Sequence, residues 1–362
     1  MLRNRLHVLA LTTLCFFAVA PARGQEDQVR TDPLDRDRLS VGSGTEGAVR
    51  IVSTSDPVEV RGLLGEWHRL HPDIRVDYIH QSSLEVYDDV VKCRDQSPCA
   101  DVAWSSAMDL QVKLVNDGYA QAFSPSEPDR IPDWAIWRKQ AFGITAEPIA
   151  LVYNKRLVPP EDVPRTRADL LNLLTAKRSM YHGKVASYDP ELSGTGFLFF
   201  SNDVQITPNT WNLVRSLGQA GVRLYTFSHT ILDRVASGEH LLAYNMIASY
   251  ALERAKEDPS IGVTLFTDYT ALITRIAIIP KSAPHPAEAA LFMDFLLSRD
   301  GQEQLAARSF GTVRSDLPAG IRATVGEDTL RPIRVGPDLL AYLDQSKRKG
   351  FFREWRRALD GR

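Results

Sequence analysis

The sequence lacks several features that would place it in a common class. Its 362 residues include three cysteines, and we find no internal repeat or low-complexity tract. No CxxC, HExxH or GxSxG pattern occurs, so spacing supports neither a zinc or thioredoxin-type site nor a hydrolase nucleophile. After the N-terminal apolar run, no segment is long enough to suggest a membrane span. The formal net charge of -2 gives no reason to expect a nucleic-acid partner.

Residues 1–24 have the pattern of a secretory signal peptide. Arg3 and Arg5 precede the uncharged run LHVLALTTLCFFAVA, and APARG offers cleavage after Ala22 or Gly24. We therefore predict export to the periplasm. Cleavage removes basic residues and no acidic one, so the mature chain is more acidic and any anion site must be built locally.

Two cysteines remain after that cleavage, Cys93 and Cys99, in VKCRDQSPCAD. The even count, the close spacing and the intervening Ser-Pro turn predict a disulfide in an oxidising compartment.

The order of the expected elements indicates an α/β fold with two lobes. Strand and helix patterns alternate from AVRIV to the helix after ADVAW, which is typical of a parallel sheet covered on both faces. A second such series follows, and two hinge crossings are expected near 143–148 and 268–271. We predict a type II periplasmic-binding-protein fold, each lobe a mixed sheet flanked by helices. Its parts are a flexible N-terminus (25–46), lobe 1 (47–143 plus 271–325), lobe 2 (147–268) and a C-terminal helical extension (326–362).

Three loops between a strand and a helix are rich in hydroxyls and glycine. They contain Ser53, Thr54 and Ser55 in IVSTSDP, Ser105 and Ser106 in AWSSAMD, and Ser193, Gly194, Thr195 and Gly196 in YDPELSGTGF. Such loops lie at the carboxyl edge of a parallel sheet, where helix N-termini attract anions. Helix capping is the alternative, with Ser106 and Asp109 as a capping box and Ser55 or Asp56 capping the first helix. Three loops of this kind in one chain favour a ligand site, which is compatible with capping.

Charged and aromatic candidates complete the predicted site. Arg138 lies beside the first crossing, and Arg275 interrupts an apolar strand, where its charge needs either an internal carboxylate or a bound anion. Glu147 suits either a ligand hydroxyl or a hinge salt bridge. Tyr244 and Asn245 end the strand LLAYN, and we expect Tyr250 to be packed rather than liganding.

The chain resembles the periplasmic solute-binding proteins of ABC importers over about residues 48–316. The resemblance rests on segments in the same order, among them VRIVSTSDPVEVRGLLGEWHRLHPDIRVDYIH, ADVAWSSAMDLQVKLVNDGYAQ, GITAEPIALVYNKRL, GKVASYDPELSGTG, GEHLLAYNMIASYALERAKEDPSIGV and IAIIPKSAPHPAEAALFMDFLLSRDGQEQLA. It is most similar to the ferric-iron and phosphorylated-sugar binders, especially the phosphoglycerate-transport regulatory branch. The resemblance implies a two-lobed protein that closes on its ligand and can report to a membrane sensor kinase.

The family's functional residues carry over only in part. Ser53, Thr54, Ser105 and Ser106 match positions where such proteins hold an anion, and the loop 193–196 matches the second lobe's contribution. Ferric binders of this class use a neighbouring tyrosine pair, whereas NMIASYAL has Tyr250 alone and Tyr244 six positions earlier. This departure favours an organic anion over iron.

We therefore predict a monomeric, non-enzymatic binding protein for a small phosphorylated or carboxylated metabolite such as a phosphoglycerate or sugar phosphate. No cofactor and no metal are expected, and the predicted partners are an ABC permease, a membrane histidine kinase or both. A ferric-iron binder and a secreted hydrolase are the alternatives. For the basic, aromatic C-terminus, we expect Phe351, Phe352, Trp355 and Leu359 to pack on a lobe; docking on a membrane or partner is the alternative.

Overall fold

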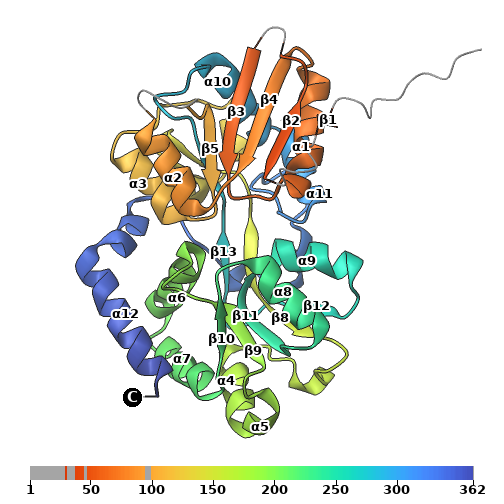
Figure 1. Cartoon of the computed structure of the whole chain (residues 1–362), viewed down its shortest axis with the longest axis vertical. Coiled ribbons are helices and arrows are strands. Elements are labelled where there is room, and N and C mark those ends of the chain that lie inside the picture. Colours follow the sequence, from red (N-terminus) through yellow and green to blue (C-terminus); the bar gives the residue numbers. More distant parts are fainter. Residues whose placement is uncertain (1–28, 31–36, 45–46, 94–98, 362) are drawn as a thin grey trace, which may run out of the picture.

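The computed structural model describes residues 29–30, 37–44, 47–93 and 99–361, and within them it shows a two-lobed α/β protein (Figure 1). Each lobe has a mixed sheet flanked by helices, as predicted. The predicted signal peptide, residues 1–24, lies outside the described residues. Across the described residues, no helix combines the length and the apolar character needed to span a bilayer.

Lobe 1 contains an eight-stranded sheet in the order β1-β2-β4-β3-β5-β14-β7-β6. Its parallel centre, in which β3 lies between β4 and β5, is the part that the alternating pattern predicts. The antiparallel strand β14 joins it from the distant end of the chain. The strands are β1 (Val29–Arg30), β2 (Arg38–Val41), β3 (Gly47–Ser53), β4 (Ile74–His80), β5 (Val102–Ser105), β6 (Ile136–Trp137), β7 (Ala141–Gly143) and β14 (Ile276–Ile278).

Helices cover both faces of this sheet because its strands are apolar on both sides. One buried cluster joins the sheet to α1 (Pro57–Leu70), α10 (Pro286–Leu297) and α11 (Arg299–Ala307). Another joins it to α2 (Ser83–Lys92) and α3 (Met108–Asn116). Ser82 and Glu85 form a capping box at the start of α2, so local sequence fixes where this helix begins.

Lobe 2 contains a seven-stranded sheet in the order β10-β9-β11-β8-β13-β15, with β12 also paired to β8. Alternating residues of its strands point to opposite faces, so Leu151 and Val152 of β8 belong to different buried clusters. The strands are β8 (Glu147–Asn154), β9 (Val185–Tyr188), β10 (Arg223–Tyr225), β11 (Leu242–Ile247), β12 (Ile261–Thr264), β13 (Thr270–Ile273) and β15 (Leu330–Pro332).

The helices of lobe 2 lie on both faces of this sheet. On one side α8 and α9 pack against it, and on the other α4, α5 and α7 do so, while α6 contributes to both clusters. Their bounds are α4 (Arg167–Ala176), α5 (Arg178–Tyr181), α6 (Gly194–Ile206), α7 (Thr210–Gln219), α8 (Ser228–Ser237) and α9 (Ala248–Glu257).

The connections between the lobes differ from the expected boundaries in one place. The first crossing leads from β7 into β8, in the expected region. The second lies between β13, which pairs with β8, and β14, which pairs with β5, so it falls at Thr274 and Arg275 rather than near 268–271. Because residues on both sides of this crossing are apolar, no turn residue marks the boundary in the sequence.

Residues 38–41 and residues 321–332 take part in the lobes in ways that the sequence does not predict. Leu39 and Val41 of β2 are buried, so the expectation of a flexible segment through residue 46 is wrong for this strand. Near the other end, Ile321 and Val325 pack on lobe 2 rather than lobe 1, and β15 adds a parallel strand beside β13. These short strands depend on partners that are distant in sequence.

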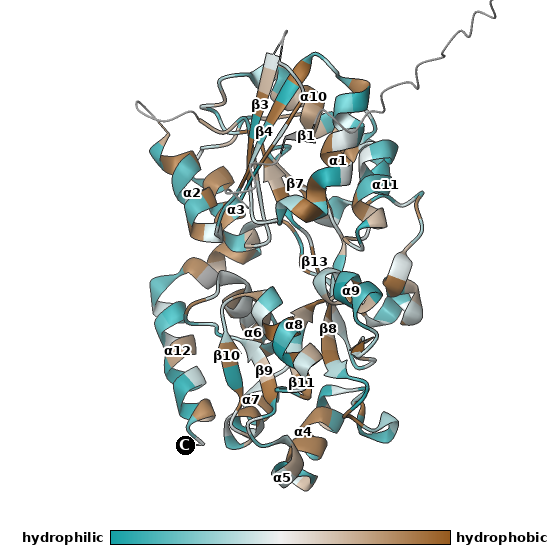
Figure 2. Cartoon of the chain, turned by 45° about the vertical axis from the view of Figure 1, so that its right-hand side comes forward, coloured by the Kyte–Doolittle hydropathy of each residue, from teal (hydrophilic) through white to brown (hydrophobic). Residues whose placement is uncertain are grey.

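The C-terminal segment then spans both lobes. The 3-10 helix η7 (Pro337–Leu343) packs beside α3 of lobe 1, and α12 (Gln345–Leu359) returns along α7 of lobe 2 (Figure 1). Trp355 is buried, with its ring centroid 4.6 Å from that of Phe200. Most of α12 is nevertheless hydrophilic (Figure 2). The apolar face of this helix therefore packs on lobe 2, as predicted.

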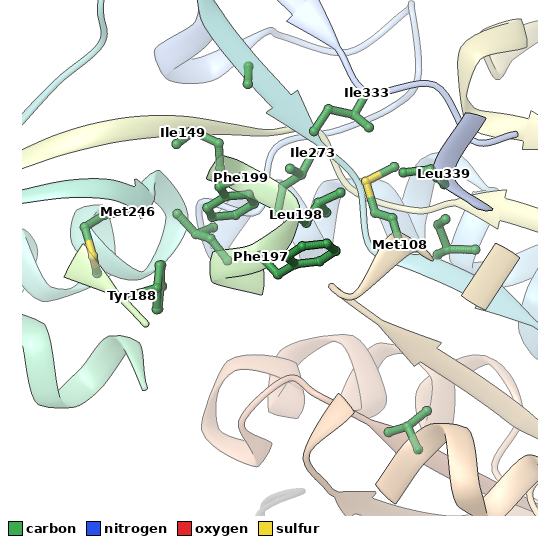
Figure 3. Close-up of a cluster of buried hydrophobic side chains, with 14 of the residues drawn as sticks. Met108, Ile149, Tyr188, Phe197, Leu198, Phe199, Met246, Ile273, Ile333 and Leu339 are labelled. Atoms are coloured by element: carbon green, nitrogen blue, oxygen red, sulfur yellow. The ribbon is translucent and has the colours of Figure 1, made fainter. Parts of the chain in front are cut away.

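An apolar cluster continues from one lobe into the other where α3, α6 and η7 meet. Met108 of α3, Phe197 and Leu198 of α6, and Leu339 of η7 lie near one another in Figure 3. The loops at the N-termini of α3 and α6 are adjacent to this cluster, so packing holds them at the junction of the lobes.

Candidate functional site

The three hydroxyl-rich loops come together at the junction between the lobes. Ser53 pairs with Trp104 across the parallel strands β3 and β5, so the first two loops leave the same sheet edge. The third loop begins α6 in lobe 2. A Cβ atom built on Gly194 would lie 3.8 Å from the Cβ of Ala107, which immediately precedes α3. The start of α6 therefore faces the start of α3 across the junction.

One serine in each loop stabilises its own backbone. Ser53 Oγ accepts a hydrogen bond from the Ser55 amide at 3.0 Å, and Ser105 Oγ accepts one from the Ala107 amide at 3.1 Å. Ser193 is the N-cap of α6 and accepts from the Gly196 amide at 3.1 Å. Of these three serines only Ser193 caps a helix, whereas Ser53 and Ser105 stabilise turns within their own loops.

Thr54 and Ser106 have a different arrangement. Their hydroxyl oxygens lie 3.5 Å apart, and the Ser106 amide donates to Thr54 Oγ1 at 3.1 Å. The proposed capping box of Ser106 and Asp109 is wrong, because α3 has Ala107 as its N-cap and no side-chain cap. Asp56 is the N-cap of α1, also without a side-chain cap. The hydroxyls of Thr54 and Ser106 are therefore not used to cap α1 or α3.

The glycines of the third loop allow a close approach of the backbone. A Cβ atom on Gly196 would lie only 2.8 Å from the Cβ of Tyr188 on β9. Thr195, between the two glycines, is buried at the start of α6. The first turn of α6 therefore sits tightly against the end of β9, with its positive dipole end directed toward lobe 1.

Arg275 finds its counter-ion inside the protein. Its side chain is 1% exposed, and Nε donates to Glu147 Oε1 at 2.9 Å while Nη2 donates to Glu147 Oε2 at 3.3 Å. Nη1 donates to Ser55 Oγ at 2.9 Å. Of the two alternatives left by the sequence, an internal carboxylate or a bound anion, the structure shows the carboxylate. Glu147 likewise forms the hinge salt bridge.

The Glu147–Arg275 ion pair connects the two crossings with residues of both lobes. Thr145 donates to Glu147 Oε1 at 2.8 Å, and Ser249 at the start of α9 donates to Glu147 Oε2. Ser55 also accepts from Trp104 Nε1 at 3.1 Å. The ring centroid of Tyr250 lies 5.2 Å from the Arg275 guanidinium carbon. Burial raises the pKa of Tyr250 well above its usual value despite the nearby positive charge, so its hydroxyl stays protonated.

Glu59 belongs to the same cluster and was missed by the sequence analysis. It lies in the first turn of α1 and is 8% exposed. Burial raises its pKa to about 8, while the charge of Arg275 acts in the opposite direction. Its Oε2 atom has no hydrogen-bond partner among the described residues. The only signal in the sequence was its position three residues after Asp56.

Tyr244 and Asn245 are directed into lobe 2 instead. The Tyr244 hydroxyl and the Asn245 amide donate to Asp203 Oδ2 at 2.8 and 2.9 Å. Arg167 donates to the Tyr244 hydroxyl at 3.1 Å, and the Tyr269 hydroxyl donates to Asp203 Oδ1 at 2.7 Å. These two predicted residues therefore serve a buried network within the lobe, and we do not include them in the site.

Arg138 is also separate from the loops. It is exposed in the turn between β6 and β7, with its guanidinium carbon 4.4 Å from the ring centroid of Trp137. Strands β6 and β7 form the edge of the lobe 1 sheet. The prediction that it binds ligand gains no support from this position.

Two further features bear on the chemistry. Cys93 and Cys99 form the predicted disulfide at the end of α2. Within the described residues, no group of three or more histidine, cysteine, aspartate or glutamate side chains is arranged to hold a metal ion. The described residues of the junction instead offer hydroxyls, helix N-termini and the buried carboxyl group of Glu59, beside the Arg275–Glu147 pair.

Comparison with known proteins identifies the family. The chain belongs to the bacterial extracellular solute-binding proteins, whose family model matches residues 53–303. It is 35% identical to the substrate-binding protein of an ABC transporter from Agrobacterium tumefaciens, with a TM-score of 0.83 over 91% of this chain and 100% of the other. No curated protein sequence matches the chain significantly. The family assignment and the fold confirm the predicted resemblance.

Two more distant structures show the same fold. AfuA from Actinobacillus pleuropneumoniae, with exogenous fructose-6-phosphate bound, is 19% identical, with a TM-score of 0.70 over 87% of this chain and 99% of the other. Iron-bound HitA from Pseudomonas aeruginosa is also 19% identical, with a TM-score of 0.66 over 86% of this chain and 99% of the other. The protein is thus a solute-binding protein that acts outside the cytoplasm, and these two structures leave the solute open.

Proposed function

We propose that this protein captures a small anionic metabolite between its two lobes, with a phosphate or carboxylate group held by the facing loops. The observation that carries the proposal is the approach of the α6 N-terminus toward the α3 N-terminus from opposite lobes. Each helix start presents amide donors and a positive dipole end, to which Thr54 and Ser106 add hydroxyls. A group with several acceptor oxygens suits this arrangement.

Arg275 has a supporting role in this proposal. Because Glu147 already neutralises it, attraction of the solute depends on backbone amides and hydroxyls rather than on a free guanidinium. The pair joins the two crossings, so it holds the hinge geometry in which the loops face each other. Ser55 extends this support to the first loop.

A ferric ion fits the junction less well. Residue 249, next to Tyr250, is a serine whose hydroxyl is bound to Glu147, so a neighbouring tyrosine pair is absent. We therefore favour an organic anion.

The wider role follows from the family. The relative from Agrobacterium tumefaciens is the substrate-binding protein of an ABC transporter. We infer that the present protein is exported to the periplasm by its N-terminal signal peptide and works as a monomer. It delivers its solute to an ABC permease or reports it to a membrane sensor kinase.

A thermal-shift screen tests this function. The ligands are phosphoglycerates, sugar phosphates, di- and tricarboxylates, and ferric citrate. A ligand at a hundred times its Kd stabilises the folded state by about 2.7 kcal/mol. We expect an organic anion to produce this shift and Ser106→Asp to abolish it by charge repulsion. Ser124→Asp, at an exposed position of lobe 1, is the matched control and should respond like the wild type.

Two results would reject the proposal. One is a screen in which ferric citrate alone stabilises the protein and no organic anion does. The other is an anion response that Ser106→Asp leaves unchanged, which would place the solute away from these loops.

A further inference from the structure

Glu59 has one carboxylate oxygen that the fold accounts for and one that it does not. As the third residue of α1, it accepts a backbone hydrogen bond from Asp56, the N-cap residue, which is a common helix-start interaction. The other oxygen, Oε2, is buried and has no partner within the described part of the chain. Leaving such an atom unpaired is unfavourable, so an unpaired carboxylate oxygen at a site calls for a ligand group.

Glu59 lies at the interlobe site, because α1 begins directly after the first loop, whose Ser55 accepts a hydrogen bond from Arg275 Nη1 at 2.9 Å. Arg275 and Glu147 of the hinge, and Asp56 on its own loop, all act on its carboxyl group. Glu59 in turn acts on Tyr78 of lobe 1 and on Tyr250 of lobe 2. Its surroundings therefore come from both lobes and from the crossings. Thr54 of the first anion-facing loop is only five positions away in the chain.

We propose that Glu59 selects solutes that carry a hydroxyl group in addition to the anionic group, by forming a hydrogen bond between Oε2 and that hydroxyl. This inference rests on the proposed function and narrows its ligand class to hydroxylated phosphates or carboxylates. Glu59 acts here as a specificity-determining residue, while the facing loops hold the anion.

The chemistry of the neighbourhood favours a hydroxyl over an ammonium group. An ammonium would need an ionised carboxylate to balance its own charge. Burial instead favours the neutral form of Glu59 near pH 7. A neutral carboxyl group both donates to and accepts from a hydroxyl, and it does not repel an anion bound nearby.

Matched ligand pairs that differ only in hydroxyl groups test the inference. Glycerol 3-phosphate is compared with n-propyl phosphate, and malate with succinate, by isothermal titration calorimetry. The wild type should bind the hydroxylated member of at least one pair about tenfold or more tightly, because a site built to pair with a hydroxyl rejects the analogue that lacks it. Equal affinities within each pair would overturn the inference.

Two variants test whether Glu59 causes the preference for hydroxylated ligands. Glu59→Met has a similar length but cannot pair with the hydroxyl, so the affinity ratio should fall toward one while binding of the deoxy member is retained. Glu59→Gln keeps an acceptor and a donor and should preserve most of the ratio. A ratio unchanged in Glu59→Met would overturn the proposal, and should that variant not fold, the wild-type ratios remain decisive.

The outcomes separate this inference from the proposed function. If no phosphate or carboxylate binds the wild type, both fail together. If anions bind through Ser106 but without preference for hydroxylated members, the proposed function stands and the role of Glu59 is rejected.

Discussion

The molecule contains buried arginines in two regions, Arg167 in lobe 2 and Arg275 at the hinge, and the partners of their charges differ. Arg167 is 7% exposed and donates to Asp203, Asp268, the Tyr244 hydroxyl and the Tyr269 carbonyl. All of these partners belong to lobe 2, and Asp203 is fully surrounded by donors. This network is complete within one lobe.

The Arg275 cluster draws its members from both lobes and from both crossings. It includes the salt bridge to Glu147, the contact with Ser55 and the nearby carboxyl group of Glu59. In this cluster one buried oxygen, Oε2 of Glu59, lacks a partner within the described chain. A buried arginine is therefore not by itself a sign of ligand binding. An incomplete set of hydrogen bonds at a junction between lobes is the more informative feature.

We expect the largest loss of stability when Asp203, the central acceptor of the Arg167 network in lobe 2, is replaced. Asp203→Ala removes the acceptor of Tyr244, Asn245 and Tyr269 and leaves Arg167 without its buried counter-ion. We expect a loss of about 3–5 kcal/mol in the free energy of unfolding, measured by urea denaturation. A loss below about 1 kcal/mol would show that the network is not tightly coupled.

A somewhat smaller loss, about 3 kcal/mol, is expected when the hinge pair is broken. Glu147→Gln keeps the shape of the side chain but leaves the charge of Arg275 uncompensated. The double variant Glu147→Gln with Arg275→Met removes both charges and should recover much of the lost stability in the same denaturation experiment. If the double variant is less stable than either single variant, this account of the pair is incorrect.

The pH dependence of the free energy of unfolding should reveal the raised pKa of Glu59. In the unfolded chain its pKa is near 4.5, whereas in the folded protein it is about 8, so the folded state holds an extra proton between these values. Its contribution to stability is complete below pH 4.5 and is lost as pH rises through 8. Between pH 6.5 and 7.5 the loss should be about 1.4 kcal/mol per pH unit.

Comparing the wild type with Glu59→Gln isolates this contribution, because the glutamine does not titrate. Asp109, whose pKa burial raises to about 6, has the same sign but titrates below this window. Parallel pH profiles of the two proteins between pH 6.5 and 7.5 would contradict a neutral Glu59.

The smallest effect is expected at the edge of the lobe 2 network. The Asp268 side chain is 30% exposed, and its Oδ2 and Oδ1 atoms accept from the Arg167 and Tyr269 amides, so the single oxygen of an asparagine keeps one of these two bonds. Asp268→Asn should therefore cost less than about 1 kcal/mol in urea denaturation. A cost as large as that of Asp203→Ala would mean that the exposed edge matters as much as the buried centre.

Much of the fold could be predicted from local patterns. The parallel centre of lobe 1, the capping box at Ser82 and the disulfide all follow from residue types and spacing. The meeting of the loops could be anticipated because carboxyl ends of parallel strands share a sheet edge. The short strands β2 and β15 were missed because their partners lie far away in the sequence.

The candidate site was harder to predict than the fold. Tyr244 and Asn245 end a strand, as expected, but their side chains meet Asp203 inside lobe 2. Glu59 was overlooked because its spacing from Asp56 is that of an ordinary helix start. A strand-end position gives the location of a residue along the chain and leaves open the face on which its side chain lies.

From the sequence alone, local patterns predict two α/β lobes with donor-rich loops and a buried partner for Arg275, and the resemblance to a known family implies a solute-binding protein. Periodicity and turn chemistry are local, and the cost of burying a charge applies in any fold. Only the tertiary structure decided that this partner is Glu147, 128 residues earlier in the chain, and that one oxygen of Glu59 has no partner among the described residues. These outcomes depend on how the crossings bring distant segments together, and no local pattern encodes that arrangement.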